Sequence, residues 1–263
     1  MTAGPERTHD AVRFDDAVAL ADEVMTLRQP ILVAFDVDGV LAPIVGHAAD
    51  AALLPGLLDS LIELSTHTPV GVVSGRAIEN LERFGFPDAF MVAGSHGAER
   101  RGTPLRPLTT TESRRLSRLR VLADRAAVDA GPGAWVEAKP TGVVLHVRES
   151  NLESGARALN QLAGAAAAVA GATVKRGHAV VEVTTRPATK ATAIKAMRLE
   201  VPPGAVVFLG DDVTDEDVFR SLTDDDLGIR VGRGVTLASR RLRGPQAVLT
   251  FVRRLVARIS TAT

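Results

Sequence analysis

Short, continuously apolar runs rich in β-branched residues recur along the chain, with helical patterns around them. The runs lie at 31–35, 70–73, 89–92, 205–209 and 227–231. Strands that are apolar on both faces are typical of a parallel sheet covered by helices on its two sides. Helical spacing at 15–27, 53–66 and 77–84 supplies such helices. The alternation predicts an α/β fold with a doubly wound, Rossmann-like parallel sheet.

The middle of the chain breaks this alternation. A helical stretch is followed by two strand-like segments, and the same order then repeats, at 110–129, 134–139 with 142–149, 152–170, and 173–176 with 179–185. The turn signal Pro140-Thr141-Gly142 joins the first two strand-like segments. This pattern predicts a small α+β unit inserted at 105–185, which we call the cap. Residues 1–104 and 186–263 then form the core domain.

Composition limits the classes of partner. Lys plus Arg and Asp plus Glu number 31 each, so no net charge draws the chain to nucleic acid or to an anionic membrane. Segment 1–16 is polar and acidic, unlike a signal peptide, and the apolar stretch 164–172 is too short to span a bilayer. The lack of cysteine fits a reducing compartment. We expect a cytoplasmic monomer that acts on a small molecule.

Two aspartates follow the first apolar run. Asp36 and Asp38 are separated by one residue, and Gly39 comes next. Residues two apart share one side of an extended chain, and ligands of open α/β sheets bind where the strands end. Two carboxylates placed there repel each other and lose hydration, a cost that a divalent cation offsets. A turn that merely contains two aspartates is the alternative.

A second acidic run comes directly after the apolar run 205–209. Its sequence is Gly210-Asp211-Asp212-Val213-Thr214-Asp215-Glu216-Asp217. Thr214 and Asp217 have the spacing of a capping box for a following helix, which explains part of the charge. Capping does not explain Asp211 and Asp212, which would face Asp36 if the two strands are neighbours. Mg²⁺ prefers octahedral oxygen coordination with several waters, so a few carboxylates from two loops suffice.

Two shorter segments supply polar groups of less specific meaning. Ser74, Gly75 and Arg76 follow the apolar run 70–73. A hydroxyl there, beside the start of a helix, suits a phosphoryl oxygen, although a helix N-cap is the ordinary role of such a serine. Lys190 is equally ambiguous, because most lysines are solvated at the surface.

The order of these segments resembles the haloacid dehalogenase superfamily of phosphotransferases: an acid pair, a strand-end serine, a lysine and an acidic Gly-Asp-Asp loop. Within that superfamily, the chain is similar to the trehalose-6-phosphate phosphatase family. The similar segments are 36–44, 72–76, 93–99, 136–139, 146–148, 181–183, Lys190 and 210–219. Val40 and Ala191 depart from the family pattern, which often has threonine and glycine there. We expect activity to survive both changes, since a backbone amide suffices at Val40 and the Lys190 ammonium acts beside Ala191.

The resemblance implies a magnesium-dependent phosphatase that forms an aspartyl-phosphate intermediate on Asp36. It implies that Mg²⁺ is bound by the carboxylates of Asp36 and Asp211 and by the backbone carbonyl of Asp38. The side chain of Asp38 would act first as general acid and then as general base. Asp212 or Asp215 would orient the waters of the metal or the ammonium of the lysine.

The resemblance also implies which residues hold the substrate. Ser74, Gly75, Arg76 and Lys190 would surround the phosphoryl group. In the cap, Glu137 and Lys139 lie two apart, so they share one face of a strand, and Glu182 would join them on the sugar hydroxyls. A solvated outer face is the alternative. Weaker sugar-binding candidates are His146 and Arg148, followed by His96, which fits a satisfied loop histidine, whereas Trp135 is expected in the cap core.

The function expected from these residues is hydrolysis of trehalose 6-phosphate to trehalose and phosphate. The alternatives are a phosphatase of another sugar phosphate, such as sucrose phosphate or a hexose phosphate, and a catalytically silent regulatory relative. Against a silent relative, all the residues expected to do the chemistry are present: Asp36, Asp38, Ser74, Lys190 and Asp211.

Overall fold

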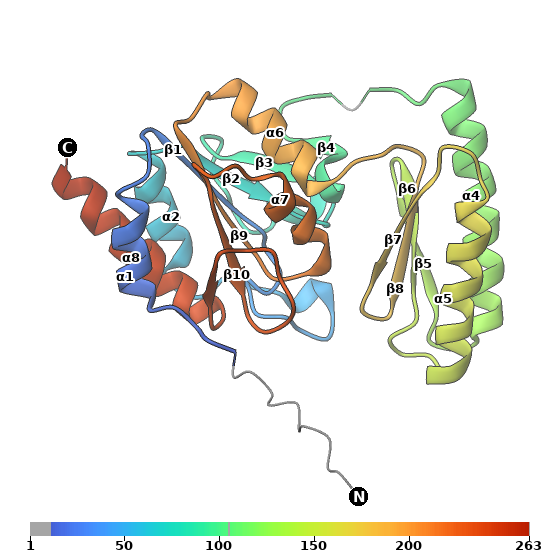
Figure 1. The fold of residues 1–263 in the computed structure, drawn as a ribbon. Helices are drawn as coiled ribbons and strands as arrows, with labels where there is room; N and C mark the ends of the chain where they lie inside the picture. The colour runs from blue at the N-terminus through green and yellow to red at the C-terminus, as the bar shows by residue number, and fades with distance from the viewer. Residues whose placement is uncertain (1–11, 105, 263) are drawn as a thin grey trace, which may run out of the picture. The chain divides into compact units, whose positions relative to one another are not determined.

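The larger of two sheets has seven strands in the order β11-β10-β9-β1-β2-β3-β4 (Figure 1). This computed structural model describes residues 12–104 and 106–262, so most of the N-terminal segment that lacks signal-peptide features lies outside it. The strands are β1 Ile31–Phe35, β2 Val70–Val73, β3 Met91–Gly94, β4 Glu99–Arg100, β9 Ala205–Gly210, β10 Leu227–Val231 and β11 Arg240–Leu242. β4 runs antiparallel to β3, whereas β1, β9, β10 and β11 run parallel. The mostly parallel α/β sheet is confirmed.

Helices lie between and beside these strands. They are α1 Ala17–Val24, α2 Leu57–Ser65, α3 Ile78–Glu82, α6 Lys190–Glu200, α7 Glu216–Ser221 and α8 Pro245–Ala262, with the short 3-10 turns η1 Ala48–Asp50, η2 Ser95–Gly97 and η3 Val213–Asp215. β1, β9 and β10 are buried along their whole length, as their continuous apolar sequences require. α8 packs against both α1 and α2, and Arg254 of α8 pairs with Asp22 of α1 at 3.0 Å.

The second sheet is antiparallel, with the strand order β5-β6-β8-β7. Its elements are α4 Thr110–Ala130, β5 Trp135–Lys139, β6 Gly142–His146, α5 Leu152–Ala167, β7 Thr173–Gly177 and β8 Val180–Thr184. We call this the cap sheet. One of its faces packs on α4 and α5 through an apolar cluster that includes Leu119, Val143, Leu145, Leu162 and Val183. The predicted helix-hairpin-helix-hairpin order is therefore confirmed.

Most charged residues of the cap sheet lie on the other face. Strand period two and the observed register put Trp135, Glu137 and Lys139 of β5 on the face opposite the apolar cluster. Glu182 of β8 lies on the same face, because Val144 of β6 pairs with it on one side and with Glu137 on the other. A sheet with one apolar and one polar face is typical of antiparallel pairing.

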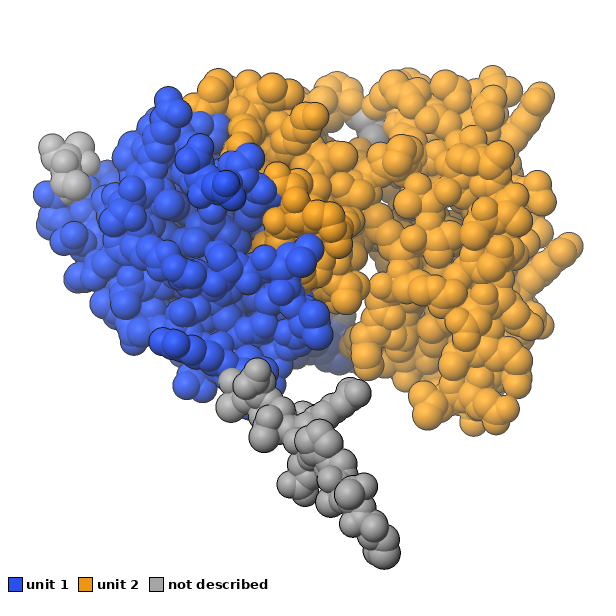
Figure 2. Space-filling model, in the orientation of Figure 1, with its two compact units in different colours: residues 1–70, 203–211, 222–263 blue, residues 71–202, 212–221 orange. Residues whose placement is uncertain are grey.

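Two compact units divide the described chain (Figure 2). Residues 71–202 and 212–221 form one of them, and the remaining parts of the chain form the other. The first of these contains the cap sheet together with α3, α6 and α7, so the contacts described below between the cap sheet and loops of the larger sheet lie within one unit. The cap boundaries at 105 and 185 stay a prediction.

Three details differ from the sequence-based expectation. The third strand begins at Met91, two residues later than predicted, because Pro87 to Phe90 form a turn whose carbonyls accept from the Arg101 guanidinium. The short edge strands β4 and β11 were not predicted, since their sequences are polar. Trp135 does not anchor the cap core: 53% of it is exposed.

Among the described residues, no helix is both long and apolar enough to cross a membrane.

Candidate active site

The loop after β1 places the carboxylate of Asp36 at the carboxyl end of the sheet. β1 pairs in parallel with β9, and the Asp36 amide donates to the Leu209 carbonyl at 2.9 Å, extending that pairing by one residue. The chain then turns back sharply, since the amides of Leu41 and Ala42 both donate to the carbonyl of Val37. Asp36 is only 4% exposed, so an ionised carboxylate there needs a nearby positive partner.

Asp211 enters the same place from β9. The register that pairs Phe35 with Leu209 brings the residues after both strands side by side. Gly39 has a φ of +77°, and a Cβ built there would overlap the Asp211 carboxylate. The glycine after the acid pair therefore serves both a left-handed turn and the close approach of Asp211.

A buried ion pair holds the third carboxylate. Asp215 is fully buried, accepts from the Lys190 ammonium at 2.7 Å through one oxygen, and accepts from the Asp212 amide at 2.9 Å through the other. Lys190, which is 2% exposed, is the first residue of α6, a helix that starts at a capping box made by Thr189 and Thr192. Lys190 is thus no solvated surface lysine, because its charge is matched inside the protein.

Within the acidic run 210–217, the residues that cap a helix are not the ones predicted from the sequence. The capping partners are Asp212 and Asp215, which bracket η3, and not Thr214 and Asp217. Asp212 therefore has a local structural role, and its side chain is exposed. Only Asp211 of the first two aspartates joins the carboxylate cluster described next.

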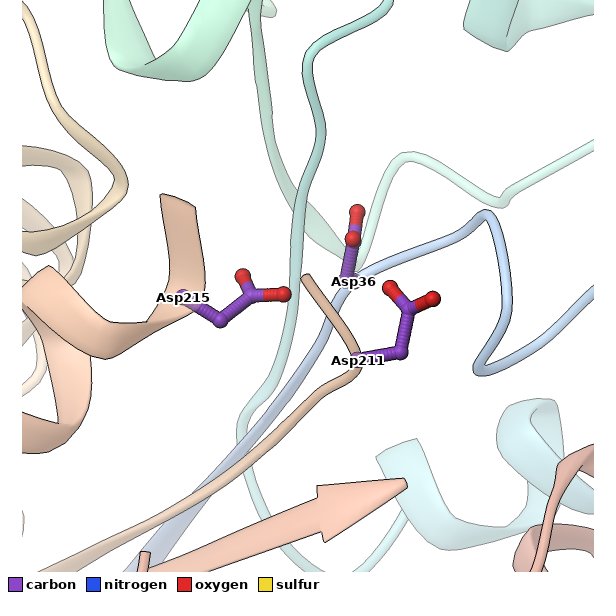
Figure 3. Close-up of side chains that lie close together, drawn as sticks. All are labelled: Asp36, Asp211 and Asp215. Carbon is purple, nitrogen blue, oxygen red and sulfur yellow. The ribbon is translucent and has the colours of Figure 1, made fainter. Parts of the chain in front are cut away.

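Three carboxylates converge where these loops meet. Asp36, Asp211 and Asp215 each offer an oxygen that lies within 4.8 Å of the others (Figure 3). Two of the three are buried. The Lys190 ammonium pairs with the cluster through Asp215, and like charges this close repel each other strongly at low dielectric. A hard divalent cation with oxygen ligands fits this donor set, and the side chains lack the sulfur or imidazole that softer metals prefer.

The loop after β2 is built around a buried hydroxyl. Ser74 Oγ accepts from the Arg76 amide at 3.2 Å, and the Ser74 carbonyl accepts from the His96 amide at 2.8 Å. A Cβ on Gly75 would lie 2.8 Å from the His96 ring, so only glycine lets that ring approach the loop. Ser95 and His96 both have left-handed backbone angles, at φ values of 49° and 55°. Strained conformations of this kind often mark functional loops.

Two charged residues of the cap sheet contact this loop and the η2 turn after β3, to which His96 belongs. Lys139 donates to the Gly75 carbonyl at 2.9 Å, and its ammonium lies 3.5 Å from the Glu182 carboxylate. Glu182 also lies 3.0 Å from His96 Nε2. Burial raises the pKa of Glu182, but the His96 hydrogen bond and the nearby positive charges outweigh burial and hold that pKa at about 2. Burial lowers the pKa of His96, which makes the contact a hydrogen bond from a neutral ring near pH 7.

The outer end of the cap face holds a second pair. His146 lies 3.0 Å from Glu137, and this hydrogen bond lowers the pKa of the Glu137 carboxyl. The predicted sugar residues are thus separated into two groups, with Lys139 and Glu182 beside Gly75 and with Glu137 beside His146. Arg148 follows the end of β6 and is exposed. His96, the weakest candidate in the sequence, contacts Glu182 directly.

One basic residue of this face was missed from the sequence. Lys175 of β7 pairs in register with Glu182, so it lies on the polar face, and burial lowers its pKa to about 8. The signal that could have found it is strand period two, which puts Lys175 on the same face as Thr173 and Gly177 and opposite Val174.

Comparison with known proteins agrees with this geometry. The family model described as trehalose-phosphatase matches residues 34–240, a range that contains the three carboxylates, the Ser74 loop and the whole cap sheet. The chain belongs to the trehalose-phosphatase family. The predicted resemblance to trehalose-6-phosphate phosphatases is thereby confirmed.

Individual relatives extend this match. A trehalose-6-phosphate phosphatase of Escherichia coli is 32% identical over 232 residues, covering 83% of this chain and 84% of that protein. A trehalose-phosphate phosphatase of Mycobacterium tuberculosis is 31% identical, covering 94% of this chain but 66% of that longer protein. Among solved structures, the C-terminal domain of Candida albicans trehalose-6-phosphate phosphatase has a TM-score of 0.80 at 22% identity and covers 95% of this chain and 99% of that one. At that identity, the last comparison supports the fold alone.

Proposed function

We propose that this member of the trehalose-phosphatase family hydrolyses trehalose 6-phosphate to trehalose and phosphate, with Asp36 as nucleophile. The observation that carries the proposal is the convergence of Asp36, Asp211 and Asp215 at the ends of β1 and β9. Phosphoryl transfer needs such a site, because the substrate dianion and the attacking carboxylate repel each other until their charges are compensated. The proposal includes a monomeric enzyme of the cytoplasm, a compartment that fits the lack of cysteine.

Magnesium is the cation that this donor set suits best. Asp36 and Asp211 would bind it through their carboxylates and Asp38 through its backbone carbonyl. When bound, Mg²⁺ supplies charge neutralisation for the phosphoryl oxygens. Both Asp215 oxygens accept hydrogen bonds, one from the Lys190 ammonium and the other from the Asp212 amide, so Asp215 would act on the metal site through bound waters.

The protein residues then carry the reaction. An Asp36 oxygen forms a bond to phosphorus while the bond from phosphorus to the sugar oxygen breaks. Asp38 gives its proton to that leaving oxygen and takes a proton back from the water that hydrolyses the aspartyl phosphate. Ser74 and Lys190 would hold phosphoryl oxygens, with the amides around Gly75 and Arg76 closing the site. The buried Lys190–Asp215 pair keeps the ammonium fixed before substrate arrives.

The sugar would be held by the polar face of the cap sheet. Lys139 lies next to Gly75 and beside Glu182, Lys175 pairs in register with Glu182, and Glu137 with His146 continues the face outward. Buried charged groups that exchange their present partners for sugar hydroxyls give strong hydrogen bonds, each worth about 1.5 to 3 kcal/mol. Charged and polar residues of this kind select a substrate by its hydroxyl pattern.

Phosphate release from trehalose 6-phosphate tests the proposal. We expect activity that needs Mg²⁺, is lost with EDTA and returns when Mg²⁺ is added in excess. Ca²⁺ should restore it poorly, because calcium prefers more ligands and looser geometry than a phosphoryl-transfer site provides. Sucrose 6-phosphate and glucose 6-phosphate, assayed beside it, should give lower kcat/KM. Full activity in EDTA, or a clear preference for another sugar phosphate, would contradict the proposal.

The lowered pKa of Lys175 predicts an alkaline limit to substrate binding. Its ammonium is charged below about pH 8 and neutral above it, so KM for trehalose 6-phosphate should rise as the pH increases through 8. In Lys175→Arg the rise should disappear, because a guanidinium keeps its charge at that pH. Lys195→Arg, on an exposed position of α6, is the matched control and should keep the wild-type profile. If Lys175→Arg also keeps it, the ammonium of Lys175 has no part in binding.

A further inference from the structure

The outer end of the cap face carries an exposed aromatic pair. Trp135 begins β5, and its indole stacks on the His146 ring with 4.0 Å between centroids and 5° between planes. Despite this contact, 53% of Trp135 is exposed. A large aromatic side chain normally buries most of its surface, so a half-exposed indole with one ring face covered leaves apolar surface for something else to cover.

The pair is held in place before any ligand arrives. Trp135 and His146 are direct cross-strand partners in the β5–β6 ladder. The His146 ring is also held by a hydrogen bond between its Nε2 and the Glu137 carboxylate, at 3.0 Å. A stack anchored by a ladder and by a charged hydrogen bond loses little conformational freedom on binding, which favours a rigid recognition surface.

The pair also has a defined place relative to the loop after β2, which contains Ser74 and Gly75. On β5, Trp135, Glu137 and Lys139 follow one another on a single face. Lys139 is the end that donates to the Gly75 carbonyl. At about 3.3 Å per residue, Trp135 lies roughly 13 Å along the strand from Lys139. The face therefore runs from charged groups beside the proposed phosphoryl site to an aromatic surface at its far end.

We propose that the Trp135–His146 pair is the stacking platform for the sugar ring that does not carry the phosphate. This inference rests on the proposed function, in which the substrate is a disaccharide phosphate. A pyranose ring has an apolar C–H face bordered by hydroxyls. The indole would remove the C–H face from water while Glu137 accepts from hydroxyls at its edge, the combination of apolar wall and few polar groups found in ligand sites. A single phosphorylated hexose, held at the Lys139 end, would not reach the platform.

The chain provides its own probe for this contact. Trp135 is the single tryptophan and the chain has no tyrosine, so near-ultraviolet emission reports on this indole. With wild-type protein and Mg²⁺, trehalose should shift or quench the emission saturably, at the concentrations that inhibit phosphate release. Glucose at equal concentration should change it little. Inhibition by trehalose with unchanged emission would overturn the platform and leave the proposed activity intact. If the wild-type protein with Mg²⁺ releases no phosphate from trehalose 6-phosphate, the proposed function itself is wrong.

Variants test the same contact through kinetics. Trp135→Ala should lower kcat/KM for trehalose 6-phosphate roughly two- to tenfold, mostly through KM, from a stacking contribution of about 0.5 to 1.5 kcal/mol. Trp135→Phe should recover most of the loss, whereas Trp135→Leu, apolar but not aromatic, should not. Leu152→Ala, at an exposed apolar position on α5, is the control and should match wild type.

The ratio between two substrates excludes an indirect effect. Phenyl phosphate is too short to reach the outer end of the face, so the kcat/KM ratio of trehalose 6-phosphate to phenyl phosphate should fall in Trp135→Ala. Equal losses on both substrates would assign the indole to folding of the cap. No loss on either would mean that Trp135 is a solvent-exposed residue or covers a different partner. Both results contradict the platform.

Discussion

Asp36→Asn is expected to abolish phosphate release from trehalose 6-phosphate. An amide oxygen is a far weaker nucleophile than a carboxylate, and its neutral group is a poorer ligand for a hard cation. The loss of kcat should reach roughly 10⁶-fold, the scale seen when other enzymes lose a catalytic nucleophile. Steady-state phosphate release over a range of Mg²⁺ concentrations measures this, since excess metal cannot restore a missing nucleophile.

The same substitution should leave the fold intact. Asp36 lies in a cluster of three carboxylates. Removing one charge relieves repulsion in the metal-free protein, so its thermal midpoint should stay equal or rise. Asp59→Asn, at an exposed position on α2, provides the matched control and should keep both activity and stability. If Asp36→Asn retains turnover above one per cent of wild type, the nucleophile is another residue and the proposed reaction is wrong.

Much of the larger sheet could be predicted because its signals are local. β1, β9 and β10 are continuous apolar runs, and full burial of each strand is what such a sequence requires. The acids that follow β1 and β9 were recognisable for the same reason. That these acids lie close together could not be predicted from the local sequence. It depends on β1 and β9 being neighbours, which the sequence only suggested through the family resemblance.

The parts that escaped prediction depend on contacts between distant segments. His96 was ranked as the weakest candidate because its role depends on contact with Glu182, which is distant in the sequence. It also depends on a left-handed backbone conformation that the local sequence does not predict. Lys175 was missed although the two-residue period of β7 already separates it from Val174; that its side is the polar face follows from the pairing with Glu182 of β8. Trp135 was placed in the cap core by its size alone, although two-residue periodicity with Glu137 and Lys139 already put it on the polar face.

The general acid–base role of Asp38 leads to the second large effect. Asp38→Asn keeps the backbone carbonyl proposed as a metal ligand, and it keeps the loop closure in which Gly39 donates to the Ala42 carbonyl. The protein should fold and require the same Mg²⁺ concentration for half-maximal activity. Its kcat for trehalose 6-phosphate should fall by roughly 10² to 10⁴, the usual contribution of a general acid or base.

The choice of leaving group distinguishes the general-acid step of Asp38 from its general-base step. A sugar alkoxide needs a proton to depart, whereas phenoxide, with a pKa of about 10 like the tyrosine side chain, leaves more readily without one. With phenyl phosphate, Asp38→Asn should therefore release one equivalent of phenol per enzyme in a rapid burst and then slow sharply, because hydrolysis of the Asp36 phosphate still lacks its base. Stopped-flow detection of phenol, with acid-quenched protein assayed for bound phosphate, measures both phases. If the activity of Asp38→Asn returns in excess Mg²⁺, the Asp38 side chain acts on the metal. If the variant turns over phenyl phosphate at the wild-type rate without a burst, the side chain has no part in the reaction. In either case another group moves the proton.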